Sequence, residues 1–257
     1  AWEMFTFSSK LLLTNVFNIL NNHAFSVLLG KCFGNTQAGV YGTARKWNDM
    51  ASGTINGMLT SVAQPTLAHV ADDNGRYVQV FRKMLRFISF ISFPALLGLG
   101  MISEEFILIA GGEKWAESAR ILSLLCIYGA FFPITTLYSN LTISRGHSGV
   151  NMACTIGQCL AVWTGLIVLY FNGYGMMHMV VFFIILNIVW LGIWQWWAKR
   201  LIGMKWRWVA CDTLPFLAFT LCILGVTWWA TSSISNLWVL MLSRIFMAAL
   251  LYAGVMY

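Results

Sequence analysis

Charge is what this sequence has least of. Only 10% of its 257 residues are Asp, Glu, Lys or Arg, whereas 59% are hydrophobic and the mean hydropathy is +0.72. Soluble domains carry roughly 25% charged residues, so this chain has too few polar groups to cover a surface in water. Lipid is therefore expected to be the solvent for much of the chain.

Proline is also scarce, and no stretch shows the apolar–polar alternation of a transmembrane β-strand. The apolar runs are instead continuous, and several reach the roughly 20 residues that a spanning helix needs. The predicted fold class is all-α, a polytopic transmembrane helix bundle of about eight spans. The expected spans cover residues 11–29, 47–70, 84–110, 121–143, 150–171, 176–197 and 208–230, with the eighth starting near residue 237.

Signatures of covalent chemistry are missing as well. The sequence has no P-loop, no HExxH and no GxSxG. Its six cysteines show neither CxxC nor a Cys/His ligand spacing, and most lie in apolar runs, where cysteine behaves as a small hydrophobe. We therefore expect no enzymatic activity, catalytic residue, cofactor, metal site or disulfide.

The net charge of +7 is interpreted as a topology signal, with no nucleic-acid partner. When the loops are numbered alternately, one side collects most of the cations, and by the positive-inside rule this side faces the cytoplasm. Residue 1 is then cytoplasmic. The cations on this side are Lys10, Arg76, Arg82, Lys83, Arg86, Arg145, Lys199, Arg200, Lys205 and Arg207. The opposite side holds Lys31, Lys114 and Arg120, joined by Arg45 and Lys46 if these count as loop residues.

Both ends of the sequence look cut. The chain starts at Ala1 instead of a methionine, and Tyr257 closes an apolar run without a polar tail. We therefore expect a longer protein, in which an N-terminal half precedes this chain and the last helix is truncated.

Polar residues are concentrated in the first two expected spans. Asn15, Asn18 and Asn22 recur at helical spacing on one face of the first span. The second span carries a stripe at steps of four, three, four and four, with Lys46 beside it. The stripe consists of Arg45, Asp49, Ser52, Asn56 and Thr60.

Two interpretations of these faces remain open. Amides and hydroxyls in a bilayer usually face a bundle interior or a water-filled cavity, where they can bind sugar hydroxyls, and Arg45 or Lys46 can attract a phosphate. Alternatively, the same groups bond to each other between helices, and Arg45 pairs with Asp49 four residues later. The candidate cavity residues are Asn15, Asn18, Asn22, Arg45, Lys46, Asp49, Ser52 and Asn56.

Three further features are expected to have structural roles. Gly53 and Gly57 form a GxxxG pattern, which predicts close helix packing. Glu104 and Glu105 are expected in a solvated interfacial position at the outer end of the third span, with a role in proton coupling as the alternative. Arg244, inside the eighth span, is expected either to snorkel or to face a groove.

Four ordered segments resemble the seventh to tenth helices of Wzx-type polysaccharide flippases, members of the multidrug/oligosaccharidyl-lipid/polysaccharide exporter superfamily. The segments are KLLLTNVFNILNNHAFSVLLGKCFG (10–34), AGVYGTARKWNDMASGTINGMLTSVAQPTLAHVADD (38–73), FPALLGLGMISEEFILIAGGEKW (93–115) and LSLLCIYGAFFPITTLYSNLTISRGHSGV (122–150). Beyond residue 150 only the hydropathy agrees.

The resemblance implies a two-bundle transporter fold around a central cavity, of which this chain holds the second half. Residues 1–200 would form the second six-helix bundle, and residues 201–257 two additional helices. It also implies alternating-access flipping of undecaprenyl-diphosphate-linked oligosaccharides across the bacterial inner membrane, for surface polysaccharides such as O-antigen or capsule. The implied partners are the lipid-linked oligosaccharide, the bilayer and the missing N-terminal half.

Three other functions remain as alternatives. A cation-coupled multidrug exporter of the same superfamily would call for an acidic midplane cluster, which the sequence does not show. A polysaccharide polymerase or ligase would need a large periplasmic loop, and no outer loop exceeds a few residues. A structural or assembly role is the residual option.

Overall fold

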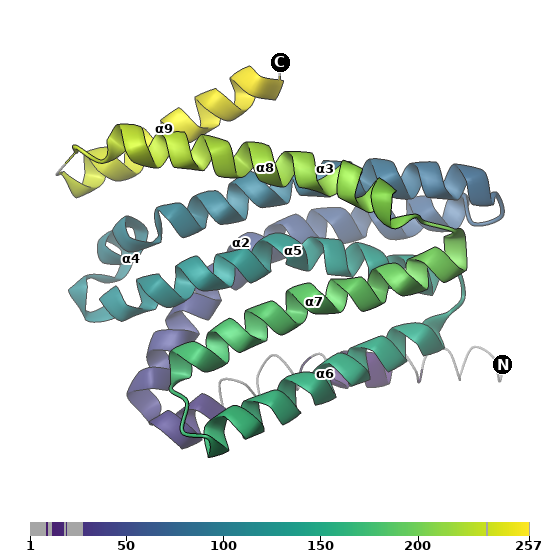
Figure 1. Cartoon of the computed structure of the whole chain (residues 1–257), viewed down its shortest axis with the longest axis horizontal. Coiled ribbons are helices and arrows are strands. Elements are labelled where there is room, and N and C mark those ends of the chain that lie inside the picture. Colours follow the sequence, from purple (N-terminus) through teal and green to yellow (C-terminus); the bar gives the residue numbers. More distant parts are fainter. Residues whose placement is uncertain (1–8, 10–11, 18, 20–27, 235, 257) are drawn as a thin grey trace.

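The computed structural model describes residues 9, 12–17, 19, 28–234 and 236–256, and their ordered elements are almost entirely helical (Figure 1). Helical backbone is present at residues 12–17 and 28–33. The elements that follow are α2 (Asn35–His69), α3 (Asn74–Met101), α4 (Ser103–Gly111), the short 3-10 helix η1 (Glu113–Trp115), α5 (Ala116–Ser144), α6 (Ser148–Phe171), α7 (Met176–Ile202), α8 (Trp206–Thr231) and α9 (Leu237–Met256).

Six stretches in the described part are long and apolar enough to cross a membrane: α3, η1 with α5, and α6 to α9. α2 is 35 residues long but too polar to meet the same criterion. The predicted all-α transmembrane bundle is thus confirmed. Most of the first expected span lies outside the described residues.

Turn chemistry explains where several helices begin and end. Gly112 closes α4 with φ of 79°, a conformation that glycine adopts without steric cost. Asp73 precedes α3, and its carboxylate accepts a hydrogen bond from the backbone N–H of Arg76 at 3.1 Å, as an N-cap should. The short connections leave neighbouring helices antiparallel (Figure 1).

Three boundaries differ most from the sequence prediction. α3 begins at Asn74, ten residues before the expected start. α2 begins at Asn35, twelve residues before the expected start, because its polar first turns carry no hydropathy signal. The third expected span is broken at Ile102, which separates α3 from α4. The break is local, since Ile102 donates a backbone hydrogen bond to the Gly98 oxygen and accepts one from the Phe106 N–H.

α5 lies at the centre of the bundle, where it packs against α2, α3, α4 and α7. In the most apolar 18-residue stretch of α5, 61% is buried, compared with 6% in that of α9. α9 packs against α8 and α4 at the periphery. Large apolar side chains such as Ile185, Leu221 and Phe246 remain exposed on the outer helices, as expected for a lipid-facing surface.

Candidate functional site

Arg45 of α2 is the buried cation of the predicted stripe. Its Nε lies 2.9 Å from both carboxylate oxygens of Asp49, and its Nη1 donates to the Tyr41 hydroxyl at 3.2 Å. The guanidinium also lies 6.0 Å from the ring centroids of Tyr128 and Phe183. The i,i+4 pairing is therefore present, while the Asp49 side chain stays 53% exposed. An anionic ligand that reached Arg45 would compete with this carboxylate.

The other candidates on α2 have separate environments. Lys46 is exposed. Ser52 is buried, and its hydroxyl donates to the Asn48 carbonyl at 2.8 Å, which satisfies it within the helix. Asn56 lines a polar cavity. The structure thus brings Arg45 and Asp49 together and separates them from Asn56.

The candidates on the first expected span are only partly described. Asn15 is exposed on the helical stretch of residues 12–17. Asn18 and Asn22 lie outside the described residues. The cavity role of all eight candidates stays a prediction.

A polar pocket of about 270 Å³ lies among α2, α5, α6 and α7. The described residues that line it are all uncharged: Asn56, Tyr128, Phe132, Thr135, Thr136, Ser139, Thr155, Gln158, Asn187 and Trp194. Tyr128 links this pocket to Arg45, because its ring forms part of the pocket lining and also lies beside the guanidinium. The sequence analysis identified only Asn56. The other lining residues lie on α5, α6 and α7, where the polar residues do not form a continuous face.

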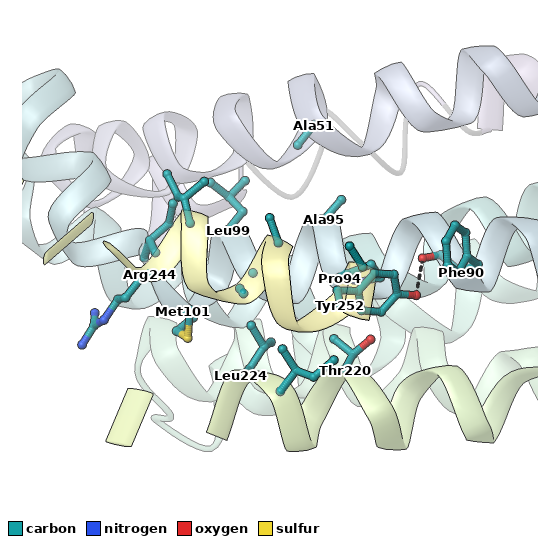
Figure 2. Close-up of a pocket in the computed structure, with 17 residues that line it drawn as sticks. Ala51, Phe90, Pro94, Ala95, Leu99, Met101, Thr220, Leu224, Arg244 and Tyr252 are labelled. Atoms are coloured by element: carbon teal, nitrogen blue, oxygen red, sulfur yellow. Dashed lines mark hydrogen bonds between the residues drawn. The ribbon is translucent and has the colours of Figure 1, made fainter. Parts of the chain in front are cut away.

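An apolar groove of about 670 Å³ runs between α3, α8 and α9 and reaches Ala51 of α2. Apart from Thr220, Arg244 and the Tyr252 hydroxyl, the side chains that line it are apolar, and Tyr252 donates to the Phe90 carbonyl at 2.7 Å. Figure 2 shows Arg244 at one end, with its guanidinium directed away from the apolar residues. The groove therefore offers an apolar surface to a hydrocarbon chain.

Arg244 is neutralised by Glu105 of α4, and both side chains are buried. Thr231 also contacts the Arg244 Nε at 3.3 Å. The expected solvated position of Glu105 is thus wrong, whereas Glu104 is exposed as expected. The break at Ile102 explains the difference, since it starts a new helix whose first turn carries both carboxylates.

A second buried carboxylate joins α3 to α8. Asp212 is fully enclosed and accepts hydrogen bonds from Arg82 at 2.6 and 3.1 Å and from Arg86 at 2.6 Å. Sequence reasoning did not single out Asp212, although a lone acid within an apolar span is itself a signal of a partner. These contacts hold α8 against the core bundle.

Comparison with known proteins gives a consistent family. Residues 1–120 match the family model described as "Polysaccharide biosynthesis protein". An uncharacterized membrane protein in the cps region of Klebsiella pneumoniae is 30% identical over 146 residues, which are 57% of this chain and 30% of that protein. The lipopolysaccharide biosynthesis protein WzxC of Escherichia coli (strain K12) is 28% identical over 145 residues, again 30% of its length.

The fold has a solved counterpart. The lipid II flippase MurJ, in an inward closed conformation, matches with a TM-score of 0.74 and 15% identity. The match covers 96% of this chain and 51% of that chain, so the whole described arrangement corresponds to about half of a larger structure.

Proposed function

We propose that this chain is a member of the Wzx-type polysaccharide flippase family and forms the second half of a transporter for lipid-linked oligosaccharides. Its cargo is an undecaprenyl-diphosphate-linked glycan unit, which moves from the cytoplasmic to the periplasmic leaflet of the bacterial inner membrane. The glycan then enters a surface polysaccharide. The chain spans only about a third of the length of the relatives it matches, so the activity is assigned to the longer protein.

One observation supports this function most directly. Within a single membrane bundle, α2 contributes to both an apolar groove, through Ala51, and a polar pocket, through Asn56. An amphiphilic cargo with a hydrocarbon tail and a hydroxyl-rich head needs these two kinds of surface close together. A purely apolar or purely polar substrate would use only one of them.

Arg45, on the same helix, is the candidate contact for the diphosphate of the cargo. It is buried among aromatic rings and paired with a half-exposed carboxylate. A diphosphate could displace Asp49 and form a charge-assisted bidentate contact with the guanidinium. Release of Asp49 would then accompany cargo binding.

The proposal also includes the rest of the protein. Residues 1–200 form the second six-helix bundle, residues 201–257 form two added helices, and a first bundle in the missing N-terminal half completes the cavity. The match to MurJ, over 96% of this chain and 51% of that chain, supports a protein about twice as long as this chain.

The test is complementation by the full-length protein in a bacterial strain that lacks its own polysaccharide flippase. We expect surface polysaccharide to return, and Arg45→Gln to reduce export by roughly ten-fold or more, because a charged hydrogen bond to phosphate contributes about 1.5–3 kcal/mol. Arg120→Gln, at an exposed position of α5, is the matched control. Continued accumulation of lipid-linked units on the cytoplasmic leaflet would refute the function.

A further inference from the structure

The polar pocket among α2, α5, α6 and α7 contains two buried groups without partners. The Asn56 Oδ1 atom is a buried acceptor, and the Trp194 Nε1 atom is a buried donor, with no hydrogen-bond partner for either among the described residues. Both residues line the same cavity, and Trp194 is only 2% exposed. Leaving a buried polar group unpaired costs about 1–3 kcal/mol. A ligand that accepts a hydrogen bond from Trp194 and donates one to Asn56 would remove this cost for both atoms.

Other amides that line the pocket are already held in place. Gln158 donates from Nε2 to the Asn187 Oδ1 atom at 2.7 Å, and Asn187 donates to the Phe183 carbonyl at 2.7 Å. Amides fixed in this way do not need to be ordered by a ligand, which lowers the entropic cost of binding. The pocket is therefore preorganised and also has unused hydrogen-bonding capacity.

Charge and size restrict the ligand. None of the described lining residues is ionisable except the Tyr128 phenol, so a carboxylate or phosphate placed there would lose hydration without gaining a counter-charge. The volume of about 270 Å³ is slightly below the roughly 300–1,000 Å³ typical of small-molecule pockets. It suits one ring-sized group better than a whole oligosaccharide.

Aromatic side chains also line the pocket and favour a sugar ring as the ligand. Tyr128, Phe132 and Trp194 present flat apolar surfaces, which match the C–H faces of a pyranose ring. Hydroxyls at the ring edge would then meet amides and threonine hydroxyls. Water alone could satisfy the two unpaired atoms but would gain nothing from three aromatic rings.

We propose that this pocket binds one uncharged pyranose residue of the glycan head, with Trp194 donating to, and Asn56 accepting from, its hydroxyls. The inference rests on the proposed function, since it assigns the cargo's sugar to a specific place in the bundle. It also separates the sugar from the diphosphate, because Arg45 does not line the pocket and its guanidinium lies 6.0 Å from the centroid of the Tyr128 ring.

The experiment is saturation-transfer NMR on the purified full-length protein in detergent. The probes are methyl α-D-glucopyranoside and methyl α-D-galactopyranoside, with the methyl glycoside of glucuronic acid, which has a free carboxylate, as the charged counterpart. We expect saturation of at least one neutral glycoside and none of the glucuronate. Trp194→Phe keeps an aromatic side chain but removes the N–H together with the five-membered ring of the indole, so binding should weaken by at least about three- to ten-fold, the effect of one hydrogen bond. Asn56→Leu should weaken it similarly.

Trp196→Phe is the matched control, since Trp196 is exposed two residues away and should leave binding unchanged. Thermal melting checks that every variant folds. Absence of saturation for both neutral glycosides, or equal saturation in Trp194→Phe, overturns the pocket assignment. Flipping by the full-length protein can be measured separately, so a protein that exports glycan yet shows no pocket binding refutes only this inference. Pocket binding without export refutes only the transport function.

Discussion

Glu105 and Arg244 form an ion pair between α4 and α9, and both side chains are largely buried. Their side chains are 6% and 10% exposed, and Thr231 provides a further contact to the guanidinium. Removing one partner of a buried pair leaves an uncompensated charge, which costs about 3–5 kcal/mol. A pair of this kind stabilises the attachment of α9 to α4 only while both members are present.

Glu105→Gln should therefore lower the thermal midpoint of the purified full-length protein clearly. The double variant Glu105→Gln/Arg244→Met should recover part of the loss, because the buried cation is then gone as well. Glu104→Gln, at the exposed neighbouring position, should melt like the parent. If Glu105→Gln also melted like the parent, the buried pairing would be contradicted.

At the scale of helices, the contact between α2 and α5 depends on a glycine. A Cβ atom at Gly129 would collide with the Asn48 Oδ1 atom and lie 3.1 Å from a Leu96 methyl group. Asn48 is completely buried, so it has no free space into which to move. Gly129→Ala should separate the two helices and cost about 1–3 kcal/mol, as overpacking usually does.

The same change at Gly57 is the control. A Cβ there meets nothing within 4 Å, and Gly53 and Gly57 are both exposed, so the packing predicted from their GxxxG pattern is wrong for the described helices. Gly57→Ala should leave the melting midpoint unchanged or raise it slightly, since alanine favours helix. Equal midpoints for the two variants would argue against the close α2–α5 contact.

Hydropathy predicts the elements well where spans are apolar and separated by glycine turns. The expected spans at 121–143, 150–171, 176–197 and 208–230 each lie within α5, α6, α7 or α8. It fails at Ile102, because a one-residue break leaves the apolar run continuous. It also leaves the polar pocket hidden, since periodicity describes one helix at a time and four helices contribute to the lining. Among the residues that line the pocket, only Asn56 belongs to a polar stripe that the sequence shows.

For the whole molecule, the arrangement of loops makes orientation testable. The turn at Arg145 lies against the α2–α3 turn, where Arg145 donates to the Ala71 carbonyl at 2.7 Å and to the Asn74 side chain at 2.5 Å. The α2–α3 and α5–α6 turns, from distant parts of the chain, thus share one end of the bundle with Arg76 and Arg145, while the α6–α7 turn lies at the other (Figure 1). The positive-inside rule predicts that the shared end is cytoplasmic.

Single cysteines in a cysteine-free full-length protein can check this orientation in bacterial spheroplasts. Asn172→Cys and His147→Cys both lie at exposed turn positions, so the side of the membrane should decide their labelling by an impermeant maleimide. We expect Asn172→Cys to react in intact spheroplasts, and His147→Cys only after permeabilisation. The opposite pattern would invert the topology and place the positively charged loops outside. It would also contradict a cargo path that begins at the cytoplasmic leaflet, because the ends of the bundle that load and release the glycan would be exchanged.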